Sequence, residues 1–274
     1  MSVSVKVRRI QICADDFGFD AGVSRGILDC MDAGRVSAAS CMVLSPAWGA
    51  WAPALRERAS HVDAGLHFDV NEFAGELTGH ADRSLSGWIT AAYLGHISAQ
   101  EARRWVNVQL DAFEAAWGGA PAYVDGHQHV HQLPVLREAV VAALQERYGQ
   151  ACALRVTVPR RWRGLKAAVI GGLGSPALER QCRRSGLRFN ADFAGVYGFQ
   201  PEADFAALVR SWLQGLPDGG LLMTHPGRAD GLGARPDAIR AARGREREFW
   251  LGTQAGELLA ELGVQIGLCA DWQG

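Results

Sequence analysis

Four stretches of this chain that are predicted to be strands end in side chains of the kinds that bind metal ions or transfer protons. These residues are Asp15 and Asp16 after the first strand, His67 after the third, His127, His129 and His131 after the fourth, and His225 after the sixth. The carboxyl ends of parallel strands open on one rim of a barrel, so residues far apart in the sequence would converge there. The sequence therefore predicts one polar site built from four strand ends.

The densest of these clusters places three histidines within five residues, at His127, His129 and His131. Packing alone explains such a cluster poorly, because each buried imidazole needs hydrogen-bond partners of its own. In an extended segment the three side chains would share one face, whereas a helical turn would align His127 with His131. The sequence leaves both arrangements open.

Two histidines and one carboxylate on one side of a divalent cation leave positions open for water and substrate, as a catalytic metal site requires. Such a cation lowers the pKa of a water molecule and polarises a carbonyl oxygen. One member of the pair Asp15 and Asp16 could then act as general base, a role that needs a carboxylate that is not a ligand. His225 could protonate the leaving nitrogen of an amide.

Each motif taken alone also has a structural explanation. An Asp-Asp pair followed by Gly18 occurs in turns and helix caps, and His225 before Pro226 is compatible with a turn. His67 on its own is typical of a hydrogen-bonded core histidine. The prediction of a catalytic site rests on the combination.

Short β-rich stretches alternate with longer amphipathic ones over the whole chain, which favours parallel strands joined by helices. The expected strands are Val7–Ala14, Ala38–Leu44, Val62–Phe68, Ala122–Gly126, Ala153–Val158, Gly220–Thr224 and Val264–Ala270, with an eighth at Leu187–Asn190. The clearest helices are Ala99–Trp117, Pro134–Tyr148, Asp204–Leu216 and Arg243–Leu262. We therefore expect an irregular, TIM-barrel-like (β/α) barrel of seven or eight parallel strands, forming a single domain over residues 1–274.

The bulk composition excludes several classes of partner. A net charge of -1 and a pI near 6.7 give no electrostatic reason to expect nucleic acid. No apolar run reaches the roughly 18 residues of a membrane span. The six cysteines form no Cys-x-x-Cys motif, so the sequence favours a reducing, cytoplasmic environment.

The combined motifs resemble those of the YdjC family of carbohydrate deacetylases, which includes chitooligosaccharide deacetylases and hopanoid-associated deacetylases. The likeness covers nearly the whole chain, as far as the Glu-rich stretch Arg245–Leu251. It is carried by Ile12-Cys13-Ala14-Asp15-Asp16-Phe17-Gly18, Gly65-Leu66-His67, Val124-Asp125-Gly126-His127-Gln128-His129-Val130-His131 and Thr224-His225-Pro226-Gly227.

The resemblance implies one divalent cation, magnesium or zinc, bound by Asp16, His67 and His127, with Asp15 as the general base. It implies that His225 is the acid that protonates the departing amine, and that the substrate is an N-acetylated sugar or glycoconjugate. The residues expected to bind substrate are Arg155, which could instead orient Asp15, and His129, His131, Asp69 and Trp88.

The chain departs from the commoner family pattern at two places. Gly126 stands where serine is usual, and Phe68-Asp69 replaces a more apolar pair after His67. Asp69 and the following segment Asn71–His96, which we expect to be a long loop over the site, are where specificity for the sugar would be set.

Two other functions stay open at this point. His127-Gln128-His129 also reads as the His-x-His pair of a metal-dependent amidohydrolase or phosphoesterase, although amidohydrolases usually carry that pair after the first strand. A second metal ion would favour that alternative. The other alternative is a sugar-binding protein that has lost catalysis. The sequence is also compatible with a homodimer.

Overall fold

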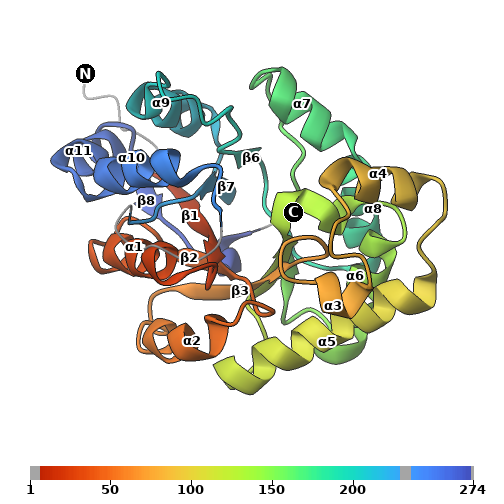
Figure 1. Cartoon of the computed structure of the whole chain (residues 1–274). Helices are drawn as coiled ribbons and strands as arrows, with labels where there is room; N and C mark the ends of the chain where they lie inside the picture. The colour runs from red at the N-terminus through yellow and green to blue at the C-terminus, as the bar shows by residue number, and fades with distance from the viewer. Residues whose placement is uncertain (1–6, 229–235, 273–274) are drawn as a thin grey trace.

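A computed structural model describes residues 7–228 and 236–272, in which strands and helices alternate (Figure 1). The strands are β1 (Arg8–Phe17), β2 (Ala38–Cys41), β3 (Asp63–Phe68), β4 (Tyr123–Gly126), β5 (Ala153–Leu154), β6 (Phe193–Ala194), β7 (Gly220–Thr224) and β8 (Val264–Ile266). The α-helices are α1 (Ala21–Asp32), α2 (Trp48–Arg56), α3 (Gly75–Thr78), α4 (Leu85–Tyr93), α5 (Ala99–Trp117), α6 (Leu136–Tyr148), α7 (Leu165–Gly172), α8 (Ser175–Ser185), α9 (Phe205–Gly215), α10 (Arg240–Leu251) and α11 (Thr253–Glu261). Two 3-10 segments, η1 (His127–Gln132) and η2 (Cys269–Asp271), complete the described part.

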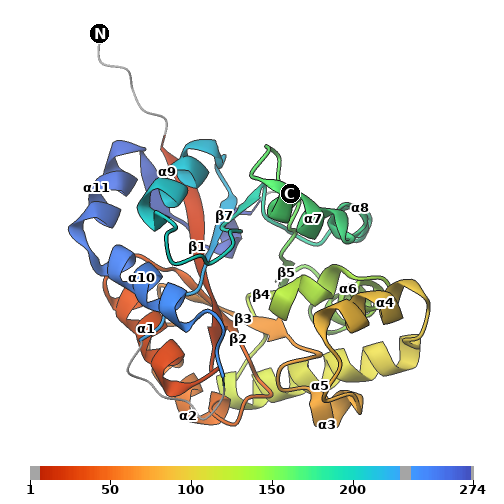
Figure 2. The same ribbon diagram turned by 45° about the horizontal axis from the view of Figure 1, so that its top comes forward.

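The strands form one curled, parallel sheet in the order β5-β4-β3-β2-β1-β7-β6, and β8 pairs with β1 beside this path. At ten residues, β1 is the longest of the described strands, and it pairs with β2, β7 and β8. Helices flank the curled sheet in both views (Figure 2). The expected TIM-like α/β architecture is therefore confirmed.

The sheet does not close by strand pairing at its two ends, β5 and β6. Instead, the side-chain amide of Asn190 accepts a hydrogen bond from the Val156 nitrogen and donates one to the Val156 carbonyl, both at 2.8 Å. The backbone adds one bond, from the Leu154 nitrogen to the Arg188 oxygen. The strand expected at Leu187–Asn190 is therefore wrong, because a side chain rather than a backbone ladder spans this gap.

Alternate residues of β1 enter different cores, as the two-residue period of a strand requires. Ile10, Ile12 and Ala14 belong to the large cluster packed between the sheet and the helices. Cys13 belongs to a smaller cluster, with Tyr123 from β4, inside the curl of the sheet. A polar side chain two residues beyond Cys13 in β1 therefore points inward as well, into the mouth of the barrel.

Two segments differ from the sequence-based expectation. Asn71–His96 contains α3 and α4 rather than an open loop, because Ser84 caps α4 and Trp88 anchors it in the core. These helices are too short to reveal a period in the sequence. Arg243–Leu262 is not one helix, since Gly252 adopts an extended conformation (φ -70°, ψ 158°) that ends α10 and begins α11.

The described residues include no membrane-spanning helix and no disulfide bond. None of the helices has both the length and the apolar character to cross a bilayer. All six cysteines are buried and unpaired.

Gly65 in β3 leaves space that a side chain would fill. A Cβ atom there would lie 2.4 Å from the ring of Tyr123. The hydroxyl group of Tyr123 forms hydrogen bonds with Cys13 and Ser40, which hold the ring in place. We expect Gly65→Ala to lower the free energy of unfolding by about 1–3 kcal/mol, as overpacking does. A Cβ at Gly119 meets no atom within 4 Å, so Gly119→Ala is the matched control. Equal urea midpoints for the two variants would contradict this account.

Candidate metal centre and active site

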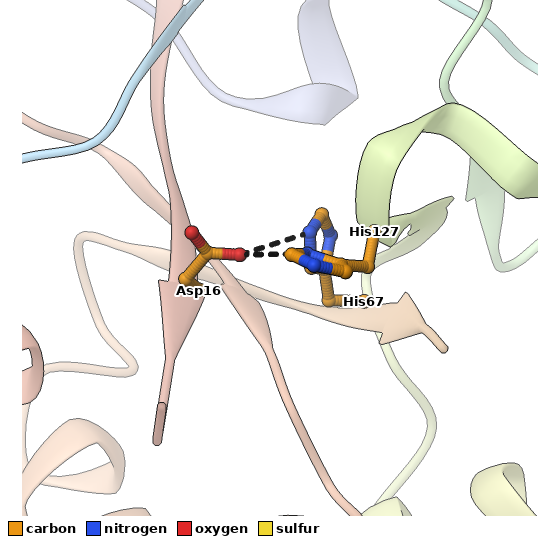
Figure 3. Close-up of side chains that lie close together, drawn as sticks. All are labelled: Asp16, His67 and His127. Atoms are coloured by element: carbon orange, nitrogen blue, oxygen red, sulfur yellow. Dashed lines mark hydrogen bonds and ion pairs between the residues drawn. The ribbon is translucent and has the colours of Figure 1, made fainter. Parts of the chain in front are cut away.

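The side chains of Asp16, His67 and His127 meet at the barrel mouth (Figure 3). The Oδ1 atom of Asp16 lies 3.4 Å from Nε2 of His67 and 3.1 Å from Nδ1 of His127. One ligand atom from each residue falls within 4.8 Å of the others. Two imidazoles and one carboxylate at this spacing form a donor set that fits a divalent cation and leaves coordination positions open.

Unusual backbone geometry brings these side chains together. The pairing of β1 with β2 shifts register between Ala14 and Phe17, and Asp16 has a φ of 71°. Such a bulge redirects a side chain, so Asp15 and Asp16 both line the same cavity although they are neighbours in a strand. After β4, Gln128 and His129 also have positive φ angles, of 51° and 62°. The segment that carries the three histidines is therefore neither extended nor a regular helix.

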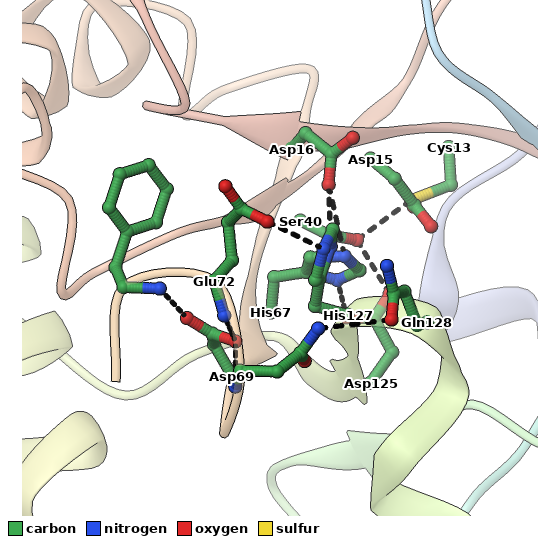
Figure 4. A network of polar contacts seen from close by, with 12 residues as sticks. Cys13, Asp15, Asp16, Ser40, His67, Asp69, Glu72, Asp125, His127 and Gln128 are labelled. Atoms are coloured by element: carbon green, nitrogen blue, oxygen red, sulfur yellow. Dashed lines mark hydrogen bonds and ion pairs between the residues drawn. The ribbon is translucent and has the colours of Figure 1, made fainter. Parts of the chain in front are cut away.

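A buried carboxylate orients His67. Asp125 accepts a hydrogen bond from Nδ1 of His67 at 2.6 Å, which leaves Nε2 facing Asp16. Asp125 also accepts a hydrogen bond from Ser40 at 2.6 Å (Figure 4). Its carboxylate lies 2.6 Å from the Arg155 guanidinium. Burial lowers the pKa of His67, but the charges of Asp125 and Asp15 outweigh it and raise the pKa to about 10. This environment stabilises positive charge at His67, and a carboxylate behind a histidine is a common second layer of metal sites.

Asp15 is held by a bidentate ion pair. Both terminal nitrogens of Arg155 donate to its carboxylate, each at 2.7 Å. Burial alone raises the pKa of Asp15, yet Arg155 and His67 outweigh it and keep the pKa below its usual range. Asp15 is therefore ionised at neutral pH. Arg155 is fully buried behind Asp15 and is not among the residues that line the cavity.

Asp16 has a guanidinium partner of its own. Nη2 of Arg243 donates to Oδ2 of Asp16 at 2.7 Å, and Nε donates to Asp237 at 2.9 Å. Burial raises the pKa of Asp16, but Arg243 and the two histidines hold it well below its usual range. One oxygen of Asp16 therefore faces Arg243, while the other faces His67 and His127.

The cluster opens into a cavity of about 970 Å³. The expected site residues that line it are Asp15, Asp16, His67, His127, His129 and His225. The structure thus gathers residues from β1, β3, η1 and the end of β7 around one space, as the strand-end argument requires.

Glu246 of α10 fixes His225 at this cavity. Its buried carboxylate accepts bonds from the backbone nitrogen of His225 at 2.5 Å, from the Thr224 hydroxyl at 2.5 Å and from the Tyr197 hydroxyl at 2.6 Å. Nδ1 of His225 has no partner among the described residues. The backbone of His225 is therefore anchored while its ring keeps a nitrogen for a ligand.

The other two histidines of the cluster lie on opposite sides of the cavity wall. His129 lines the cavity, its Nδ1 has no partner in the described part of the chain, and burial with nearby positive charge lowers its pKa well below the usual range. His131 lies behind the wall, where its Nε2 donates to the Arg155 carbonyl at 3.0 Å and burial lowers its pKa to about 4. A Cβ on Gly126 would lie 2.8 Å from Nδ1 of His131, which is why glycine fits at 126.

Asp69 and Trp88 lie outside the cavity lining. The Asp69 carboxylate accepts bonds from the backbone nitrogens of Asn71, Glu72 and Phe73, so it shapes the segment after β3 (Figure 4). Glu72 from this segment does line the cavity, with its carboxylate 3.9 Å from Nε2 of His127. Trp88 is fully buried against Trp105.

Sequence reasoning did not single out four residues of the site. Asp125 had a detectable signal, because it directly precedes Gly126 and His127 in the strand-end cluster. Glu72, Arg243 and Glu246 had none, since their partners are distant in the sequence and no spacing connects them.

Comparison with known proteins identifies the family. The sequence profile of the YdjC-like proteins matches residues 9–261. The chain belongs to this family. A mouse protein named carbohydrate deacetylase is 31% identical, over 96% of this chain and 93% of its own length. A chitooligosaccharide deacetylase of Yersinia pestis is 31% identical over 49% of this chain and 54% of its own.

Two solved structures share the fold. A protein from Enterococcus faecalis, described as a candidate cellobiose-phosphate cleavage protein, superposes with a TM-score of 0.72 at 19% identity, over 97% of this chain and 98% of its own. A lactam utilization protein from Thermus thermophilus superposes with a TM-score of 0.56 at 18% identity, over 94% of this chain and 99% of its own.

The Asp125–His67 bond generates a prediction about metal affinity. Asp125→Asn keeps the size of the side chain but weakens the acceptor that orients His67, so we expect affinity for a divalent cation to fall about 10–100-fold. Calorimetric titration with zinc measures this change. Asp32→Asn, which alters a carboxylate on the surface, is the matched control. An Asp125→Asn protein that binds zinc as tightly as the unmodified chain would remove Asp125 from the site.

Proposed function

We propose that this protein is a metal-dependent carbohydrate deacetylase, which hydrolyses the N-acetyl group of an amino sugar. The observation that carries the proposal is the position of the Asp15–Arg155 pair beside the cluster of Asp16, His67 and His127 in one cavity. The family relatives named carbohydrate deacetylase, from mouse and human, support the choice of substrate class.

Asp16, His67 and His127 would hold one divalent cation. When bound, this cation would polarise the acetyl carbonyl and lower the pKa of a water molecule. Nitrogen and carboxylate ligands together accept zinc and several other cations, magnesium among them. The donor set is therefore compatible with several divalent metals and does not select one of them.

Asp15 would accept the proton of the attacking water. Its carboxylate is ionised at neutral pH, lines the cavity and lies next to Asp16 in the chain. The bidentate contact with Arg155 fixes the plane of the carboxylate, which orients it for proton transfer. Arg155 is therefore assigned the orienting role rather than direct contact with substrate.

His225 would protonate the nitrogen of the departing amine. An amide nitrogen is a poor leaving group until it gains a proton, and an imidazole can supply one near neutral pH. The bonds of Glu246 to Thr224 and to the His225 backbone hold this histidine at the cavity. His129, whose Nδ1 is unpartnered at the wall, would bind the sugar.

The alternative of a two-metal amidohydrolase or phosphoesterase needs a second ion. Cys13, Asp15 and Asp125 form the second group with ligand-like spacing among the described residues. The Arg155 guanidinium already lies among them, with Nη2 3.0 Å from Cys13, 2.7 Å from Asp15 and 2.6 Å from Asp125. A fixed cation at this position supports a site for one metal ion.

The direct test is acetate release from N-acetylated glycans by the purified protein. We expect acetate and a free amine in equal amounts, loss of activity after treatment with a chelator, and recovery when a divalent cation is restored. Metal analysis should give one equivalent per chain. A protein that releases no acetate from any N-acetylated glycan tested with metal restored would contradict the proposal.

Substitution of Asp15 should have a different effect from substitution of a ligand histidine. Asp15→Asn should retain the metal and lose at least about 100-fold in kcat, the usual contribution of a general base. His127→Ala should lose both metal and activity while the barrel stays folded, because the site lies at the rim. Metal content, kcat and the circular dichroism spectrum separate these outcomes. Loss of metal from Asp15→Asn would mean that the two aspartates have exchanged roles.

A further inference from the structure

The two histidines of the candidate metal centre present different ring nitrogens to Asp16. His67 turns Nε2 toward Oδ1 of Asp16, at 3.4 Å, whereas His127 turns Nδ1 toward the same atom, at 3.1 Å. A histidine that binds a metal ion through one ring nitrogen usually donates a hydrogen bond from the other, which fixes the tautomer and the plane of the ring. Each histidine therefore needs a partner for its second nitrogen, Nδ1 in His67 and Nε2 in His127.

A carboxylate lies at each of these second nitrogens (Figure 4). Asp125 lies 2.6 Å from Nδ1 of His67, and the carboxylate of Glu72 lies 3.9 Å from Nε2 of His127. Asp125 is fully buried, whereas the Glu72 side chain is 23% exposed and lines the cavity. Glu72 does not belong to the group of ligand-like spacing that His67 and His127 form with Asp16. Its position is therefore that of a partner of a ligand, as Asp125 is, and not that of a fourth ligand.

A tight turn after β3 carries Glu72 to the cavity. The carboxylate of Asp69 accepts hydrogen bonds from three backbone nitrogens that follow it in the chain, those of Asn71, Glu72 and Phe73. An aspartate is suited to this role because its short side chain reaches the backbone two residues on. The buried side chain of Gln109 on α5 in turn pairs with the Asp69 backbone, with its oxygen 2.8 Å from the nitrogen and its amide 2.7 Å from the carbonyl. Asp69 therefore fixes the backbone from which Glu72 projects.

Two side-chain contacts join this turn to other segments of the site. Asn71 donates to Oε1 of Gln128 at 3.0 Å, and Gln128 directly follows His127 with a positive φ of 51°. The ring of Phe73 meets that of Phe19 edge to face, with the ring centres 5.6 Å apart. Phe19 lines the cavity after the end of β1. The turn is therefore held against both η1 and the segment that follows the two aspartates.

We propose that Glu72 is a positioning residue for His127: its carboxylate stabilises the proton on Nε2 while Nδ1 binds the cation. This inference rests on the proposed function, because it requires His127 to be a metal ligand. Negative charge at Nε2 selects the tautomer that leaves the Nδ1 lone pair free, and it makes that nitrogen a stronger donor. Since 3.9 Å is longer than a hydrogen bond, the attraction is weaker than that between Asp125 and His67.

Calorimetric titration of Glu72→Gln with zinc tests this role. The substitution keeps the size of the side chain and removes its charge, so we expect the affinity to fall about tenfold, the lower end of the effect of such partners. The urea midpoint of the metal-free protein should stay the same, because the side chain lies at the cavity surface. Glu76→Gln, at an exposed position of α3 outside the cavity lining, is the matched control and should keep the affinity. Equal zinc affinities in the unmodified chain and both variants would overturn the inference.

The absorption spectrum of the cobalt(II)-loaded protein separates positioning from a general effect of charge. If Glu72 acts through His127, Glu72→Gln should change the energies or intensities of the d–d bands, because these report the orientation and donor strength of the ligands. Weaker binding with an unaltered spectrum would mean that the charge acts on the cation without His127, and the inference would be wrong. A fall of one in the coordination number, measured by X-ray absorption, would make Glu72 a ligand and would also overturn it.

The turn that carries Glu72 should transmit a change made at Asp69. Asp69→Asn weakens the hydrogen bonds that hold the turn, because an amide oxygen is a poorer acceptor than a carboxylate. We expect it to lower the affinity for zinc, and the double variant with Glu72→Gln should bind little more weakly than Glu72→Gln alone, since both changes act through one contact. Fully additive losses would overturn the positioning of Glu72 by Asp69.

These measurements require no turnover, so they separate this inference from the proposed reaction. If Glu72→Gln weakens zinc binding and alters the cobalt spectrum while the unmodified protein releases no acetate, the inference stands and the proposed reaction is wrong. If acetate is released and Glu72→Gln binds zinc as tightly as the unmodified chain, the reaction stands and the inference is wrong.

Discussion

Three carboxylates buried at the mouth of a curled sheet are the constraint around which this molecule is organised. Asp15, Asp16 and Asp125 are nearly inaccessible to water, and an unpaired buried carboxylate is expensive. Two buried guanidinium groups compensate them, Arg155 between Asp15 and Asp125 and Arg243 at Asp16. Such ion pairs add little net stability, since desolvation offsets the attraction, but they fix the position and charge of each carboxylate. Because both oxygens of each carboxylate have a partner, each carboxylate is held in one orientation, and His67 and His127 lie against them.

The strands and one helix position the charged groups from different sides. The strand ends deliver Asp15, Asp16, His67 and Asp125 from the rigid part of the sheet, and the bulge in β1 aims two neighbouring aspartates into the same space. Helix α10 acts from the outside, where Arg243 contacts Asp16 and Glu246, three residues later, holds the backbone of His225. Residues three apart lie on the same face of a helix, so one element positions groups on two sides of the candidate centre. A constellation supported in this way is preorganised for catalysis, because its side chains need not reorient when substrate binds.

Family membership and fold limit the chemistry that this cavity can perform. A barrel of this kind hosts many reactions, so the residues of the site, and not the architecture, support a deacetylase. Within the cavity, carboxylates and histidines from the strand ends form one part of the lining, and aliphatic side chains of α4 and α7 form another. The proposed reaction is thus assigned to residues at the strand ends, while these helices supply another part of the wall around the same space.

The sequence by itself determined the strand-end clusters, the parallel α/β architecture and helix α5, whose bounds agree with the expected Ala99–Trp117. These depend on local period and on the rule that parallel strands share a rim, both of which are visible in one dimension. It did not reveal the gap closed by Asn190, the break at Gly252 or the burial of Trp88 away from the cavity. Nor did it show that Arg155 bridges two carboxylates, or that Arg243 reaches Asp16 across 227 positions of the chain. Such contacts are decided only by tertiary structure, because a buried charge selects its partner by proximity in space, and that proximity exists only after the sheet has curled and the helices have packed around it.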